Sequence, residues 1–235
     1  MTAAEIVQEL EKLATESIRN VLLKHGIPEP VLGVKVEELK KIQRRVKRDY
    51  QLSLDLYDTG IYDAMYLAGL IADDRRMTKK DLRKWVRNAK SMALCGTTVS
   101  WVAAESLHGW ELALEWIDSI REGVAVAGWE TLSSLVGIRD DVHLDLDKIR
   151  QLLVRIQDEI HSSPNRVRYS MNGFVIAVGT YVSSLSDFAA QAGSSIGRVT
   201  VDVGDTSCKV PYAPESIEKV RKKGAIGKKR KTAKC

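Results

Sequence analysis

Proline is scarce in this chain, and its placement limits the fold more than any other absence. The chain has 235 residues, and residues 31–163 contain no proline. The five prolines are Pro28, Pro30, Pro164, Pro211 and Pro214. Proline breaks helix interiors because its ring removes a backbone donor and clashes with the preceding turn. A proline-free run of this length, with few clusters of β-branched residues, is typical of consecutive helices and predicts a mainly α-helical fold.

Cysteine and histidine are too few and too dispersed for the common metal or disulfide frameworks. The three cysteines, Cys95, Cys208 and Cys235, form no CxxC pair, and the four histidines show no HExxH or HxH spacing. This pattern argues against a disulfide framework and a zinc ribbon, and we expect neither a metal nor a cofactor. No apolar stretch approaches the ~20 residues that span a bilayer. Because the first 16 residues also carry four glutamates, we predict a cytoplasmic protein without a secretory signal.

The excess of positive charge is confined to the C-terminus. Lys and Arg number 36 against 31 Asp and Glu, which gives a net charge of +5. Residues 221–235 hold eight of these bases and no acid, so the other 220 residues carry a net charge of −3. The densest cluster is Lys228, Lys229, Arg230 and Lys231. It follows two glycines, so we expect it to be mobile unless a partner holds it.

Hydrophobic periodicity divides the chain into helices joined by short connections. Two helix starts carry capping residues: Thr78 precedes Asp81, and Asp145 precedes an aliphatic run. Residues 199–203 alternate between valine and polar residues and predict one short extended segment. The expected helices are about 2–25, 35–49, 51–57, 60–73, 78–90, 98–108, 109–122, 124–138, 145–161, 166–184, 186–197 and 215–222.

Three of these helices begin with an aromatic residue and continue with small and aliphatic ones. They contain Tyr62, Trp129 and Tyr169, and more polar helices lie between them. A pairwise stack of helices at ~40 residues per unit is the arrangement of HEAT-type solenoids. We therefore predict an all-α, HEAT-like helical repeat domain over residues 1–197. A C-terminal extended segment, short helix and basic tail follow over 198–235. An irregular helical globule is the alternative.

The helix expected over residues 35–49 has an apolar stripe and strongly basic other faces. The cations are Lys40, Lys41, Arg44, Arg45, Lys47 and Arg48. Such a face is either solvated or placed against an anionic partner. The C-terminal cluster has the same ambiguity, because a solubilising tail and a nuclear-import signal share its composition. From the residues alone, contact with nucleic-acid phosphates and a solvated surface stay open as alternatives for both groups of cations.

Three motifs occur in an order that is familiar. The first is LGVKVEELKKI at residues 32–42, and the second is LYDTGIYDAMYLA at residues 56–68. The third is Arg166-x-Arg168-x4-Gly173-Phe174. In this order, over roughly residues 25–185, they resemble the bacterial DNA alkylation repair family. That family comprises alkylpurine DNA glycosylases and relatives built of HEAT-like repeats.

The resemblance implies a DNA-binding repair protein. Active members of that family excise N3- or N7-alkylated purines. They place aromatic side chains around the lesion and use an Asp to stabilise the cationic sugar in the transition state. By this resemblance, Trp129 and Phe174 are candidate groove aromatics, and Arg166 and Arg168 are candidate DNA contacts. It also favours DNA contact for the two groups of cations, at residues 40–48 and 228–231. The partner implied is double-stranded DNA, alkylated or otherwise non-standard.

The sequence departs from the family pattern at the catalytic position. The family's Trp-Trp-Asp-x-x-Asp segment falls near residues 93–98, ALCGTT, which hold no carboxylate. The arginine of its middle Trp-x-x-Arg motif is also replaced, because Leu132 stands three positions after Trp129. We therefore predict a divergent member whose glycosylase activity is lost or altered. Glu105, Glu111 and Glu130 are the acids to examine if activity is found.

A protein-binding scaffold is the rival interpretation, because helical repeats present peptide grooves as readily as DNA-binding ones. Salt-dependent affinity for duplex DNA would separate the two. Trp129 is the one tryptophan that we predict as a groove residue, with core packing as its alternative. Cys95 has no base near it in the sequence and is predicted to be buried and structural.

Overall fold

The computed structural model describes residues 1–204, 206 and 208–234. These residues form helices and connecting segments, with no β-strand among them, which confirms the predicted all-α class. The α-helices are α1 (Ala3–Leu13), α2 (Glu16–Lys24), α3 (Val36–Val46), α4 (Tyr50–Asp58), α5 (Tyr62–Ile71), α6 (Lys79–Asn88), α7 (Met92–Leu94), α8 (Ser100–Glu105), α9 (Gly109–Trp116), α10 (Glu122–Ile138), α11 (Leu146–Glu159), α12 (Asn165–Tyr181), α13 (Ser186–Ile196) and α14 (Ala213–Lys222). The π-helical turn η1 spans Cys95–Val99, and 3₁₀ turns lie at η2 (Asp141–His143), η3 (Ile160–Ser162) and η4 (Ser183–Leu185).

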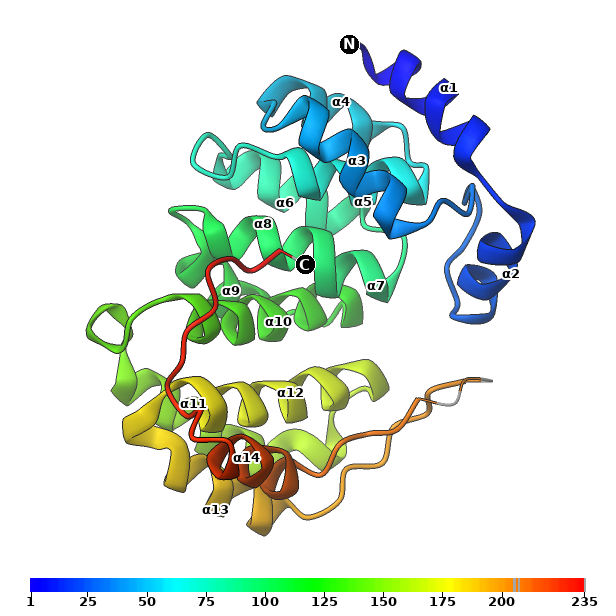
Figure 1. Ribbon diagram of the computed structural model, residues 1–235. Helices are drawn as coiled ribbons and strands as arrows, with labels where there is room; N and C mark the ends of the chain where they lie inside the picture. Colours follow the sequence, from blue (N-terminus) through cyan, green and yellow to red (C-terminus); the bar gives the residue numbers. More distant parts are fainter. Residues whose placement is uncertain (205, 207, 235) are drawn as a thin grey trace.

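The helices stack in chain order in two rows (Figure 1). An inner row runs through α3, α5, η1 with α8, α10, α12 and α14, and α4, α6, α9 and α13 pack behind it. Most residues of α5 and α10 are buried, whereas α6 and α11 bury only one stripe. A helix that is apolar around its circumference has to be covered on all sides. The aromatic-led segments at Tyr62, Trp129 and Tyr169 therefore mark three inner helices.

The single helix predicted over residues 2–25 is wrong, because the chain breaks between α1 and α2. Ala14 is extended, and the Thr15 hydroxyl accepts a hydrogen bond from the Ile18 N–H, which caps α2. The Thr15 N–H donates to the Gly33 carbonyl (3.0 Å) and holds the break against the following loop. The break turns α2 away from the axis of α1 (Figure 1). The predicted caps at Thr78 and Asp145 are both confirmed.

A buried carboxylate explains the spacing of the first two sequence motifs. Asp63 is 1% exposed, and its two oxygens accept the backbone N–H groups of three consecutive residues, 32–34. The N···O distances are 2.7 Å from Leu32, 3.2 Å from Gly33 and 2.8 Å from Val34. Gly33 has a φ of +90°, and a Cβ there would lie 2.5 Å from the Arg19 backbone nitrogen. The motifs therefore have a structural role in joining the loop before α3 to α5.

The C-terminal tail is an ordered strap, which corrects the expectation that it is mobile. We call residues 225–234 the C-terminal strap. It runs from the end of α14 across the stack towards α8 (Figure 1). The Gly227 N–H donates to the Thr180 carbonyl of α12 (2.8 Å), and the Arg230 N–H donates to the Gly137 carbonyl of α10 (2.8 Å). The Ala233 N–H reaches the carboxylate of Glu105, the last residue of α8 (2.7 Å).

Two lysines complete these strap contacts. Lys229 donates to the Val136 carbonyl (2.9 Å) and pairs with Asp141 (2.7 Å). Lys234 donates to the Ala72 carbonyl just after α5 (3.3 Å) and pairs with Asp74 (2.8 Å). The last carbonyls of a helix lack intrahelical partners and carry partial negative charge. The basic strap meets both needs at α10, at α12 and just after α5, where it donates to main-chain carbonyls, and at α8 it binds the Glu105 side chain.

The chain changes character at Arg198, but its C-terminal part shares the core of the stack. Residues 198–204 and 208–212 run as two non-helical arms that project on the side of α2 (Figure 1). Beyond them, Ala213, Ile217 and Ala233 belong to the same hydrophobic cluster as the inner helices. Gly179 of α12 leaves the space that the Ile217 side chain occupies.

Candidate functional site

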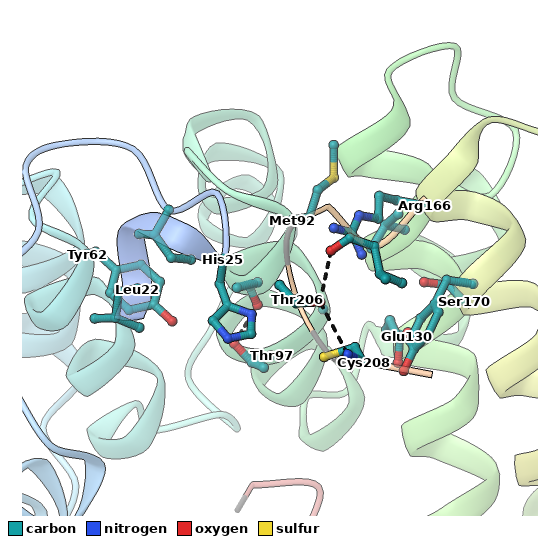
Figure 2. Close-up of a pocket in the computed structure, with 16 residues that line it drawn as sticks. Leu22, His25, Tyr62, Met92, Thr97, Glu130, Arg166, Ser170, Thr206 and Cys208 are labelled. Atoms are coloured by element: carbon teal, nitrogen blue, oxygen red, sulfur yellow. Dashed lines mark hydrogen bonds between the residues drawn. The ribbon is translucent and has the colours of Figure 1, made fainter. Parts of the chain in front are cut away.

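A hollow of about 430 Å³ lies between α2, the inner row and the arms. We call it the groove hollow. Leu22 and His25 line one side, and Glu130 and Ser170 line the opposite side (Figure 2). Its other lining residues are Ile27, Tyr62, Met92, Ala93, Gly96, Thr97, Val126, Arg166, Tyr169, Val203, Thr206 and Cys208. The break between α1 and α2 is what allows α2 to reach this position.

The π-helical turn η1 contributes Gly96 and Thr97 to the groove hollow. Hydroxyl groups bind to carbonyls along this turn: Thr97 Oγ1 donates to Ala93 O (2.6 Å), and Ser100 Oγ donates to Gly96 O (2.8 Å). Side-chain bonds of this kind compete with the regular helix ladder, and π-helical turns occur frequently at functional sites. The turn overlaps residues 93–98, where the family resemblance places a catalytic acid and this chain has none.

Glu130 is the carboxyl group that lines the groove hollow. Burial raises the pKa of Glu130 to about 7, and a hydrogen bond with the Ser170 hydroxyl limits the rise. A Cβ built on Gly96 would lie 3.6 Å from Glu130 Cγ, which is ordinary van der Waals contact, so η1 lies directly beside the stem of the acidic side chain. Near neutral pH this group is therefore present in both its protonated and its ionised form.

The other two acids named from the sequence lie elsewhere. Glu105 accepts hydrogen bonds from the Thr232 hydroxyl and the Ala233 N–H of the strap. Glu111 is exposed on α9, where the hydrogen bond from Lys79 lowers its pKa. Glu105 is thus occupied by the C-terminal strap and Glu111 by a surface ion pair, which leaves Glu130 as the acid of the groove.

The two arginines of the late motif do not converge. The Arg166 side chain lines the groove hollow, and its backbone N–H donates to Glu122 (2.7 Å) at the start of α10. Arg168 is partly buried outside the hollow, and its side chain reaches Asn165 Oδ1 at 3.4 Å. Of this pair, Arg166 alone is placed to meet a ligand in the groove hollow.

Trp129 and Phe174 lie in the hydrophobic core, which corrects their placement as groove aromatics. Both side chains are 0% exposed, and their rings pack against each other with centroids 5.5 Å apart. They join the two inner helices α10 and α12. The aromatic side chains that do line the groove hollow are Tyr62 and Tyr169, which begin the first and third aromatic-led segments.

The predicted basic face of α3 and the end of the strap surround a second hollow of about 420 Å³. Arg44, Lys47 and Arg48 line it from one side, and Thr232 and Lys234 line it from the other. Asp74 and Glu105 lie between them, and each is engaged by the strap. Residues almost 190 positions apart in the sequence therefore meet at one edge of the inner row.

The ten cations predicted at residues 40–48 and 228–231 fall into two groups. Lys41 pairs with Glu38, Arg45 with Glu9 and Lys229 with Asp141, and the Arg230 guanidinium lies 5.7 Å from the centre of the Tyr181 ring. Among the described residues, the others form no ion pair: Lys40, Arg44, Lys47, Arg48, Lys228 and Lys231. We call these six residues the basic edge. Their contact with DNA stays a prediction.

Comparison with known proteins identifies the family. The model of the DNA alkylation repair enzyme family matches residues 6–199, which is most of the chain. The chain belongs to this family. The match confirms the resemblance inferred from the sequence motifs, and it extends beyond both ends of the region over which those motifs could be followed.

Two relatives of this DNA alkylation repair family protein come from Listeria. The uncharacterized protein Lin0241 of Listeria innocua is 31% identical over 94% of this chain and 98% of its own length. The uncharacterized protein Lmo0209 of Listeria monocytogenes is 30% identical over the same shares. A solved structure is described as a new family of proteins related to the HEAT-like repeat DNA glycosylases with affinity for branched DNA structures. It is 34% identical, with a TM-score of 0.93 over 100% of both chains. The HEAT-like helical fold predicted from the sequence is thereby confirmed.

Sequence reasoning did not assemble the groove hollow of this family member. His25, Thr206 and Cys208 belong to no sequence motif. Glu130 was named only as one of three acids to examine if glycosylase activity is found. Their common feature is spatial, because α2, α10 and the arms meet only in the folded chain. The aromatic starts at Tyr62 and Tyr169 were the one available signal.

Other chemical features of the protein are simple. Burial raises the pKa of the Cys95 thiol to about 11, in agreement with a buried, structural cysteine. Within residues 1–204, 206 and 208–234, no cluster of three or more His, Cys, Asp or Glu side chains is arranged to hold a metal ion. No single helix in the same ranges is long and apolar enough to cross a membrane. One pair of helices joined at a sharp bend, Asn165–Tyr181 with Ser183–Ile196, reaches the length and composition of a membrane span, and no other feature of the described residues supports that role.

Proposed function

We propose that this protein binds branched DNA, with the basic edge holding the phosphates of one arm. The observation that carries the proposal is that Arg44, Lys47 and Arg48 meet the end of the strap around one hollow. Among the described residues, none of these three cations forms an ion pair. Lys and Arg that neutralise phosphates release counterions and supply most sequence-independent affinity for DNA. The affinity for branched DNA ascribed to the structurally similar family supports a branched rather than a linear ligand.

Excision of alkylated purines is not part of the proposal. The stretch at residues 93–98 lacks the family's acid, and Glu130 has a pKa raised to about 7 by burial. A carboxyl that is only partly ionised near neutral pH stabilises a cationic sugar less well than a fully ionised one, because that stabilisation requires the charged form. Release of 3-methyladenine and 7-methylguanine from methylated DNA is therefore expected to stay at the uncatalysed level. Robust release would overturn this part of the proposal.

The binding proposal is tested with a four-way junction and a duplex of equal length, by fluorescence anisotropy at several salt concentrations. The wild-type protein is expected to prefer the junction. The triple variant R44A/K47A/R48A is expected to lose roughly 10- to 100-fold in junction affinity near 100 mM salt. Its log–log salt slope should fall by about 2–3, since each phosphate contact contributes roughly 0.9.

The matched control removes three cations from the outer row. The variant K80A/K84A/R87A alters exposed residues of α6 and changes the net charge equally. It is expected to retain junction affinity within about twofold, because distant exposed charges are largely screened at this salt. Equal losses in both triple variants would reduce the effect to net charge and overturn the basic edge. No junction binding by the wild-type protein at low salt would favour the protein-binding scaffold.

A further inference from the structure

The groove hollow is unsuited to phosphates and suited to a small planar ligand. Leu22, Ile27, Met92, Val126 and Val203 give it apolar walls. Two tyrosines, Tyr62 and Tyr169, add aromatic surface. Its volume of about 430 Å³ lies in the range of small-molecule sites, which combine apolar walls with a few polar groups. A DNA duplex does not fit such a space, whereas a single unpaired base does.

The polar groups of the hollow are concentrated at one end. Glu130 and Ser170 lie together on the side opposite α2, and Arg166 lies above them (Figure 2). The Glu130 side chain lines the hollow, and among the described residues the Ser170 hydroxyl is its hydrogen-bond partner. A partly buried carboxylate with so few donors is destabilised, and a ligand with N–H donors lowers its free energy.

Among the bases, guanine offers the best complement to this carboxylate. Its base-pairing edge presents two neighbouring N–H donors, N1–H and the N2 amino group, which two carboxylate oxygens accept together. Adenine and cytosine present a single amino donor beside an acceptor nitrogen on that edge. Charge-assisted, bidentate hydrogen bonds are stronger and more specific than neutral ones.

We propose that the groove hollow receives one unpaired guanine at a DNA branch point, with Glu130 accepting hydrogen bonds from N1–H and N2–H. The proposal rests on the proposed function and deepens it by naming a base and the residue that reads it. The tyrosines supply aromatic surface for the base, as in proteins that bind single-stranded nucleic acid. Arg166 at the rim is placed for the phosphate of the extruded nucleotide.

The experiment compares junctions that differ by one unpaired base at the branch point: guanine, hypoxanthine, adenine or none. Hypoxanthine lacks the N2 amino group but is otherwise guanine. The wild-type protein is expected to bind the guanine junction about 10-fold more tightly than the adenine junction, with hypoxanthine between them. A good bidentate pair is worth about 1–3 kcal/mol of discrimination.

Two variants identify the residue. E130Q presents a donor where guanine also has a donor, so its guanine-to-adenine affinity ratio is expected to fall to about one. E11Q, an exposed change on α1, is expected to keep the wild-type ratio. Near-equal affinity of the wild-type protein for all four junctions would overturn the base site while leaving branched-DNA binding intact. A ratio unchanged in E130Q would overturn the role of Glu130. Absence of junction binding altogether would instead remove the proposed function.

Discussion

At the scale of single residues, a buried and a partly buried acid show how hydrogen-bond donors decide the role of a carboxyl group. Asp63 is almost fully enclosed and accepts three backbone N–H groups. Glu130 has one hydroxyl partner, and burial raises its pKa to about 7. Donors stabilise the charged form, and burial alone destabilises it. Asp63 is therefore a structural acid, whereas Glu130 retains capacity for a ligand.

The raised pKa of Glu130 makes stability depend on pH. Between its ordinary pKa of 4.5 and about 7, the folded protein holds a proton that the unfolded chain releases. Stability contributed by this proton is lost as pH rises through that window. E130Q is expected to be about 1–2 kcal/mol more stable than the wild type at pH 8, or roughly 2–8 °C in Tm, with no gain near pH 4.5.

Thermal unfolding of both proteins from pH 4.5 to 8.5 measures this difference. His25 also lines the groove hollow, but it is common to both proteins, so its contribution cancels in the comparison. E11Q serves as the exposed control on α1. A Tm difference between E130Q and the wild type that stays constant over the whole range would contradict the raised pKa.

At the scale of elements, the helices could be predicted and the path of the tail could not. Apolar periodicity and the caps at Thr78 and Asp145 are local signals, and both describe what formed. The break at Thr15 was missed because the apolar pattern continues through it. Composition likewise describes Lys228–Lys231 as a free basic tail. It contains no sign that the carbonyl ends of α10 and α12 lie along its path.

The end of the strap is held by a mostly buried ion pair, whose loss should lower the stability of the protein. The side chains of Lys234 and Asp74 are 10% and 7% exposed. Burial raises the pKa of Asp74, and Lys234 opposes that rise. K234A is expected to destabilise the protein by about 2–4 kcal/mol, because it leaves a buried carboxylate without its partner. The loss should become smaller as the pH is lowered, because a protonated Asp74 has no charge for Lys234 to balance.

A double-mutant cycle separates the pair from simple loss of packing. D74N/K234A removes both charges, so it is expected to be more stable than K234A alone at pH 8. K231A, on the exposed part of the strap, should change stability by less than about 0.5 kcal/mol. Chemical denaturation measures the four proteins of the cycle, which are the wild type, D74N, K234A and D74N/K234A, together with the control K231A. If K234A and K231A behave alike, the strap end contributes little to stability.

At the scale of the whole molecule, the two candidate surfaces lie at opposite ends of the inner helices. The groove hollow is lined mainly by their N-terminal halves, through Tyr62, Glu130 and Arg166. The strap crosses their C-terminal ends, from Thr180 of α12 to Ala72 after α5. No local pattern encodes this division, since it arises only when helices from distant repeats align. The same alignment decides between the two alternatives for Trp129, which packs in the core against Phe174 of α12 and does not line the groove hollow.

The strap connects helices far apart along the stack, so loosening it should affect several of them together. In K229A/K234A, the side-chain contacts to Val136, Asp141, Ala72 and Asp74 are lost in the full-length chain. Hydrogen exchange is expected to speed up roughly 10-fold in the last turns of α5, α8, α10 and α12, which corresponds to about 1.4 kcal/mol of local opening. The first turns of α10 and α12, beside the groove hollow, should keep their protection. K228A/K231A removes equal charge from exposed strap positions and should leave all four helices unchanged. Faster exchange confined to residues next to position 234 would show that the strap lies on the stack without linking the stability of one repeat to that of another.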